Sequence, residues 1–117
     1  TLFNASGSAP VFACRAWVNF NGQGTVAIRD SGNVSSITDD GTGKYTINFT
    51  TAMSDANYAV HVSAPSYNSG NGSVHPQIYG AGSGGIVGLQ TTSQIKVAWL
   101  GGATYYDPQY YYVSIYR

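Results

Sequence analysis

The stretch CRAWVNFNGQGTVAIRDSGNVSSITDDGTGKYTINF, residues 14–49, decides how this chain folds. It holds four runs rich in strand-forming residues, and we expect strands at 14–20, 25–29, 33–38 and 44–50. The connecting segments combine glycine with Asp or Asn, which is the chemistry of tight turns. The stretch therefore predicts a series of hairpins.

The run at 44–50 shows the clearest pattern, because Tyr45, Ile47 and Phe49 alternate with polar residues. That is the period of a strand with one buried face. In the first strand the same period places one set of small and apolar side chains on the core side: Phe12, Cys14, Ala16, Val18 and Phe20. Trp17 then points away from the core.

The rest of the chain continues this pattern. We expect further strands at 57–64, 74–79, 86–91, 94–100 and 109–116, and Pro76 marks the second of these as an edge strand or a bulge. About nine or ten short strands separated by turns are typical of an all-β, antiparallel β-sandwich or jelly-roll-like fold. Residues 1–11 read as a linker or lead-in segment, and residues 12–117 as a single domain.

The composition narrows the classes of partner. Five basic residues balance five acidic ones, so no basic field exists to attract nucleic acid. No apolar run approaches the ~20 residues of a membrane span, and we expect no membrane insertion. The lone Cys14 has no disulfide partner within the chain and is expected to pack as a small apolar side chain.

Several short segments of the sequence resemble a region that recurs in bacteriophage tail fibre proteins, often near their C-termini. They are RAWVNFNG (15–22), GTVAIR (24–29), SGNVSSITD (31–39), GTG (41–43), YTINF (45–49) and DANYAV (55–60). The likeness covers about half of the chain and brings no catalytic residues with it. It implies a trimeric, β-rich domain of a virion appendage, extracellular and in contact with the host surface.

Large aromatic side chains fall on the side of two strands that faces away from the core. Trp17 lies on this side of the first strand, and Tyr110, Tyr112 and Tyr116 on that of the last. Such side chains are costly to leave in water, so we expect a neighbouring subunit to cover them. The last strand carries aromatic area on both sides, which also favours a central place in a sheet. A sugar stacked on Trp17 is the alternative.

Two predicted loops carry the residue types of adaptable binding surfaces. Their candidate contact residues are Tyr67, Asn68, Asn71, Tyr105, Tyr106 and Asp107. Such loops suit a host cell-surface glycan or an outer-membrane protein.

The sequence offers little catalytic chemistry. All five carboxylates are expected in turns, where Asp bonds to the backbone, so a polysaccharide depolymerase with two facing carboxyl groups is disfavoured. His61 and His75 flank a loop and could face one another, but two imidazoles alone hold a metal poorly. We expect no enzyme activity, no cofactor and no bound metal. The main alternative is a monomeric carbohydrate-binding module of a secreted bacterial protein.

Overall fold

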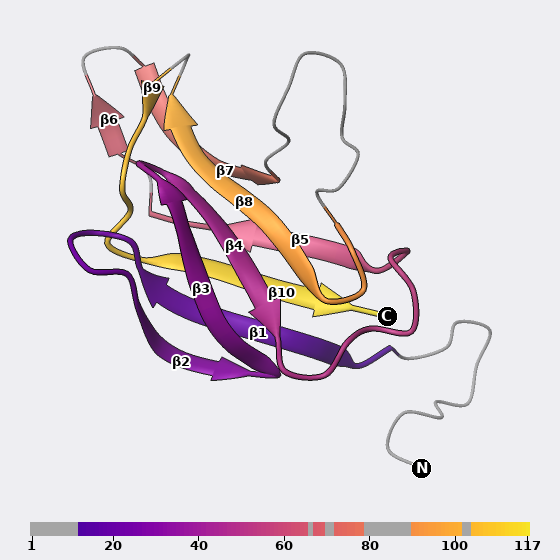
Figure 1. Cartoon of the computed structure of the whole chain (residues 1–117). Coiled ribbons are helices and arrows are strands. Elements are labelled where there is room, and N and C mark those ends of the chain that lie inside the picture. Colours follow the sequence, from indigo (N-terminus) through magenta and orange to yellow (C-terminus); the bar gives the residue numbers. More distant parts are fainter. Residues whose placement is uncertain (1–11, 66, 70–71, 79–89, 102–103) are drawn as a thin grey trace.

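A computed structural model of the chain describes residues 12–65, 67–69, 72–78, 90–101 and 104–117. These residues form an all-β sandwich of two antiparallel sheets, as expected (Figure 1). The strands are β1 (Cys14–Asn21), β2 (Ala27–Gly32), β3 (Val34–Gly41), β4 (Lys44–Phe49), β5 (Ala59–Ser63), β6 (Tyr67–Ser69), β7 (Gly72–Ile78), β8 (Gln94–Gly101), β9 (Thr104–Tyr105) and β10 (Tyr111–Tyr116). The proposed lead-in segment 1–11 lies outside the described residues.

The first sheet has the order β2-β1-β10-β5, and the second has the order β3-β4-β8-β7-β6 with β9 beside β8. The expected strand at 109–116 is confirmed in a central position, because β10 pairs with both β1 and β5. Pro76 lies on β7 beyond the three residues that pair with β6, so the side of Pro76 away from β8 has no ladder partner among the described residues. The prediction of an edge strand is therefore correct at Pro76 alone and wrong for β7 as a whole, which lies between β8 and β6.

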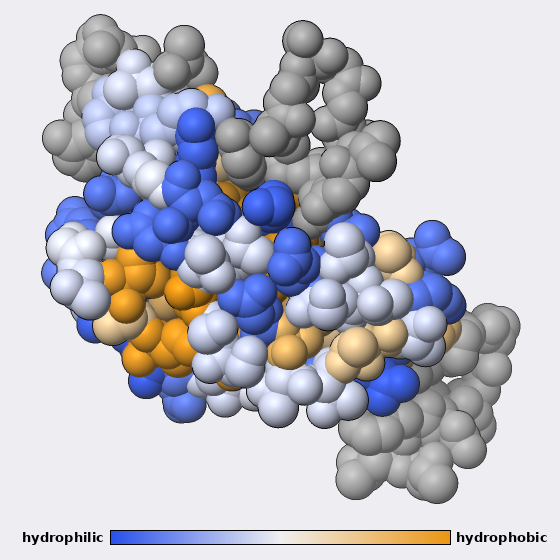
Figure 2. All heavy atoms as spheres, in the orientation of Figure 1, coloured by the Kyte–Doolittle hydropathy of each residue, from blue (hydrophilic) through white to orange (hydrophobic). Residues whose placement is uncertain are grey.

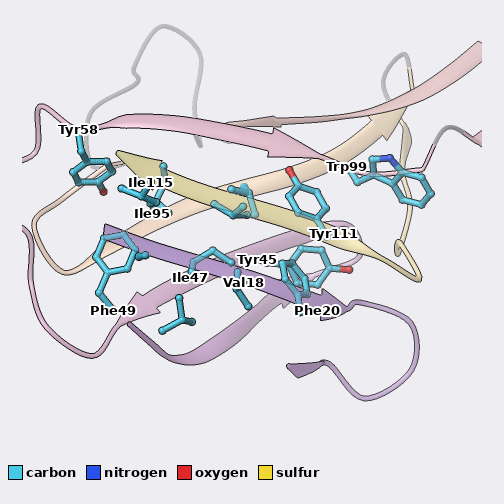
Figure 3. Close-up of a cluster of buried hydrophobic side chains, with 14 of the residues drawn as sticks. Val18, Phe20, Tyr45, Ile47, Phe49, Tyr58, Ile95, Trp99, Tyr111 and Ile115 are labelled. Carbon is cyan, nitrogen blue, oxygen red and sulfur yellow. The ribbon is translucent and has the colours of Figure 1, made fainter. Parts of the chain in front are cut away.

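The core lies between the two sheets, and its side chains come from both (Figure 3). The ring of Phe20 is fully buried between Tyr45, 5.1 Å away at 68°, and Tyr111, 5.3 Å away at 25°. Burying one such side chain contributes about 1.5–3 kcal/mol. The alternation predicted for 44–50 is confirmed, because Tyr45, Ile47 and Phe49 all belong to this core.

The expected series of hairpins is correct for β1–β2 and β3–β4 but wrong for β2–β3. β2 continues through residues 30–32, where the sequence predicts a turn, and the chain then crosses from one sheet to the other. The crossing residue is Asn33, in the left-handed region at φ 57°. Its side chain donates to the carbonyls of Arg15 and Thr51, each at 3.0 Å, and accepts from the Thr51 amide at 2.7 Å. These bonds tie the corner to β1 and to the connection that follows β4.

Two expectations about the start of β1 were also wrong. Cys14 is exposed and Phe12 is 63% exposed, although the alternation placed both on the core side. The register between β1 and β10 shifts between Cys14 and Ala16, and a bulge of this kind breaks the two-residue period. The period holds from Ala16 onward.

The hairpin expected from 86–91 and 94–100 is described only in part. Gln90 forms an isolated antiparallel bridge with Ile95, and residues 79–89 lie outside the described residues. His61 and His75 belong to strands of different sheets, so the expected hairpin between their strands is not formed.

Candidate functional site

The outer face of the four-stranded sheet carries three of the exposed large hydrophobic side chains of the described chain. Trp17 is 41%, Tyr112 39% and Tyr116 41% exposed. Trp17 on β1 pairs with Ser114 on β10, and Tyr112 and Tyr116 lie two residues to either side of Ser114. Diagonal neighbours of this kind lie within reach of aromatic side chains. The expectation that Trp17 faces away from the core is confirmed.

Neighbouring groups hold these rings in place. The indole of Trp17 lies over Gly32, where any added Cβ would collide with its ring nitrogen. Tyr110 stacks on Tyr112 with 6.4 Å between ring centroids, and the guanidinium of Arg29 lies 4.1 Å from the centre of the Tyr110 ring. We call Trp17, Tyr110, Tyr112 and Tyr116 the aromatic face.

The outer face of the second sheet is different in character. Figure 2 shows mainly hydrophilic side chains over β3, β4 and β8. There the amide of Asn48 donates to the hydroxyl oxygens of Ser36, at 3.2 Å, and Thr38, at 3.0 Å. Polar groups that satisfy one another need no further cover. The contrast singles out the aromatic face as the sheet surface with unmet hydrophobic area.

The predicted loop at 105–107 is bonded to and packed against other parts of its own subunit. Asp107 accepts, on one carboxylate oxygen, the hydroxyl of Tyr45 and the amide of Gly43, both at 2.8 Å. Burial, together with the Asp107 carboxylate, raises the pKa of Tyr45 far above its ordinary value, so this hydroxyl stays a donor. Tyr106 packs against the core, and the ammonium of Lys44 lies 4.3 Å from the ring centre of Tyr105.

A hollow of about 230 Å³ opens beside this loop, lined by Gln23, Trp99, Tyr106 and Asp107. The other predicted loop approaches the same end of the second sheet. β9 pairs with β8 at Leu100, and on the opposite side of β8 the same Leu100 pairs with His75 of β7. β7 in turn pairs with β6, so Tyr67 and Asn68 lie on a strand and the prediction of a loop is wrong for them, whereas Asn71 lies outside the described residues.

The opposite end of the sandwich carries two hollows that the sequence did not reveal. One, of about 360 Å³, is lined by Arg15, Asn33, Thr51, Ala52, Met53, Ser54 and Arg117. Its neighbour, of about 230 Å³, shares Arg117 and adds Phe12, Asn57, Ala59 and Tyr116. The hydrogen bond between the Arg117 guanidinium and Asp55 lowers the pKa of that carboxyl. No single stretch contains these linings, so no local motif could have signalled them.

The described residues contain no group of three or more His, Cys, Asp and Glu side chains arranged to hold a metal ion. Within the same part of the chain there is no helix long and apolar enough to cross a membrane.

No protein-family model matches the chain, and no curated protein or solved structure is significantly similar to it. The fold defines the class, an antiparallel β-sandwich with one aromatic and one polar outer face.

Proposed function

We propose that this domain is a non-enzymatic receptor-binding domain of a phage tail fibre that acts as a homotrimer, with the aromatic face as the surface where subunits meet. The observation that carries the proposal is the exposure of Trp17, Tyr112 and Tyr116 on one sheet face. The sequence resemblance to phage tail fibre proteins is the basis for placing the domain on the outside of a virion and for proposing three subunits.

The energy available on the aromatic face favours a protein partner. A Trp or Tyr side chain can bury about 150–250 Å², so rings that are about two-fifths exposed leave roughly 60–100 Å² each in water. At about 25 cal/mol per Å², covering the three most exposed rings contributes about 5 kcal/mol per subunit. That is a useful share of the cost of association, which is about 4–15 kcal/mol.

A second hydrophobic area lies at the side of the sandwich. Figure 2 shows it between β2 and β3, the edge strands that carry the half-buried Ile28 and Ile37. These strands lie next to one another but belong to different sheets, so the core is less well covered there. A neighbouring subunit would add this area to the contact.

In this proposal the β6 and β9 end of the second sheet faces the host, where a surface glycan or an outer-membrane protein is the receptor. Three copies presented together convert weak single contacts into firm attachment, because the second and third contacts form at high effective concentration. The low charge of the chain, 9% of residues, suits neutral hydrogen bonding and stacking better than long-range attraction.

One observation favours a second candidate, a monomeric carbohydrate-binding module. The indole of Trp17 lies over Gly32, so one side of the ring is supported by backbone, as in a sugar-stacking platform. In that case the aromatic face binds ligand directly and no assembly is needed.

A glycan array separates the two candidates. The fluorescent wild-type domain is compared with Tyr112→Asp, which places a charge on the aromatic face, and with Lys96→Ala on the polar face of the second sheet. We expect the Tyr112 variant to be monomeric and to bind at least ten-fold more weakly through lost multivalency, while the Lys96 variant matches wild type. If the wild-type domain binds glycans as a monomer and Trp17→Ala abolishes that binding, the domain is a carbohydrate-binding module and the proposed homotrimer is wrong.

A further inference from the structure

The hollow of about 360 Å³ is built by four segments that are distant in the sequence. Arg15 comes from β1, Asn33 from the crossing between the sheets, residues 51–54 from the connection after β4, and Arg117 from the end of β10. Asn33 bonds to Arg15 and to Thr51, so it fixes two of these walls relative to each other. We call this hollow the arginine pocket.

Arg15 differs from the other basic residues in how its charge is met. Arg117 pairs with Asp55 at 2.6 Å, Lys96 lies 3.8 Å from Asp40, and Arg29 and Lys44 lie over tyrosine rings. Arg15 donates only its Nε–H, to the carbonyl of Arg117 at 3.3 Å. Its two terminal nitrogens make no hydrogen bond or ion pair with the residues that the structure describes.

No Asp or Glu side chain lines the pocket. Asp55, the acid bonded to Arg117, has both carboxylate oxygens occupied: one accepts from Arg117 Nε at 3.1 Å and from the Asn57 amide at 2.8 Å, and the other accepts from Arg117 Nη2 at 2.6 Å. The Asp55 charge is therefore matched by Arg117, whereas the two terminal nitrogens of Arg15 keep their N–H groups free among the described residues. A guanidinium with free N–H groups is suited to carboxylate or phosphate oxygens.

The remaining lining suits a saccharide. Thr51 and Ser54 supply hydroxyl groups, and Ala52 and Met53 supply apolar surface. Beyond Arg117 the neighbouring hollow presents Phe12, which is 63% exposed. Sugar rings present hydroxyl edges and apolar faces, so a chain of sugars lying across Arg117 would meet both kinds of surface.

We infer that the arginine pocket binds the oxyanion of an acidic saccharide, a sugar carboxylate or a sugar phosphate, with Arg15 as the principal contact. The inference rests on the proposed function, because it names the class of host glycan that the domain takes. A second recognition surface thus lies at the end of the sandwich away from the β6 and β9 loops.

Titration of the intact chain with glucuronic acid, glucose 6-phosphate and methyl glucoside, followed by calorimetry, tests this inference. We expect both acidic sugars to bind at least ten-fold more tightly than the neutral one, and the tighter of the two identifies the oxyanion. Arg15→Gln is expected to lose ten-fold or more in affinity, and Arg15→Lys to lose less. Lys96→Gln, which removes an equal charge on the polar face of the second sheet, is expected to bind as wild type does.

The mass of each sample in solution and its urea midpoint are measured alongside. Equal binding of the three sugars, or an Arg15→Gln protein that is folded and binds as wild type does, would overturn the inference. If that protein does not fold, Arg15→Lys and Ser54→Ala take its place, and unchanged affinity in both would also overturn it. If the protein is a trimer that binds neutral glycans but no acidic sugar, this inference is refuted and the proposed function stands. If the protein is a monomer that binds acidic sugars, the inference stands and the proposed homotrimer is refuted.

Discussion

The side chain of Asn33 should contribute more to stability than an exposed asparagine usually does. It makes three bonds to the backbone of Arg15 and Thr51 and stands at φ 57°, at the corner where the chain changes sheets. In this exposed setting three such bonds are worth about 2 kcal/mol together. The left-handed backbone costs alanine about 1 kcal/mol more than asparagine. Asn33→Ala should therefore lower the free energy of unfolding by about 3 kcal/mol.

A series of variants separates these contributions. Asn33→Asp retains the acceptor for the Thr51 amide but loses both donors, so we expect a loss of about 1 kcal/mol in high salt, where the new charge is screened. Asn33→Gly loses all three bonds without the backbone strain, and should lie between the other two. Asn48→Ala on the polar sheet face removes an asparagine that bonds only to hydroxyl groups, and serves as the control.

Urea unfolding at equal protein concentration measures the effect, because any assembly makes stability depend on concentration. With urea slopes of about 1–3 kcal/mol/M, a loss of about 3 kcal/mol moves the midpoint by about 1 M or more. The reasoning fails if Asn33→Ala lies within about 0.5 kcal/mol of wild type, or if Asn33→Asp is as damaging as Asn33→Ala.

Three further predictions concern the core and its edges. Burial raises the pKa of Tyr58 to about 12, so its contribution to stability is complete below pH 10 and is lost as the pH rises toward 12. In alkaline unfolding the loss of stability should therefore be smaller in Tyr58→Phe than in wild type, by about 1–2 kcal/mol after allowance for solvent. Gly22→Ala forces a Cβ against Tyr45 and Pro108 and should cost about 2–3 kcal/mol by thermal unfolding, against about 1 kcal/mol for Gly24→Ala, which meets only backbone strain. Tyr45→Phe and Asp107→Asn should each destabilise by about 1.5–3 kcal/mol, and the double variant by less than their sum in a double-mutant cycle.

Each of these three has its own contrary result. If Tyr58→Phe loses as much stability at alkaline pH as wild type does, a group other than Tyr58 is responsible for the loss. Equal costs for the two glycine variants would mean that the Tyr45 side chain moves aside freely. Strict additivity in the cycle would mean that Tyr45 and Asp107 do not interact energetically.

Local patterns identified the elements whose neighbours are also local. The alternation of Tyr45, Ile47 and Phe49 predicts β4, because a one-face-buried strand needs only a period of two. The two aromatic sides of β10 likewise predict its central place.

The wrong predictions concern places where the structure depends on contacts between residues that are far apart in the sequence. The sequence Asp30-Ser31-Gly32 is compatible with a hairpin turn and with a crossing between the two sheets. Only the bonds of Asn33 to Arg15 and Thr51 distinguish the crossing from the hairpin. The sequence predicts Asp107 as a loop residue open to ligand, because its partner Tyr45 lies 62 positions away. The arginine pocket has the same origin, because its walls meet only after both sheets have formed.

The mass of the wild-type chain in solution, measured by sedimentation equilibrium across a range of concentrations, tests the central claim most directly. A subunit has a mass of 12.3 kDa, and burial of the aromatic face between copies predicts a species of three times that mass. The fluorescence of Trp17 should then shift to longer wavelength on dilution, as the interface opens to water. A single species of 12.3 kDa at every concentration, with fluorescence that does not change, would contradict the account.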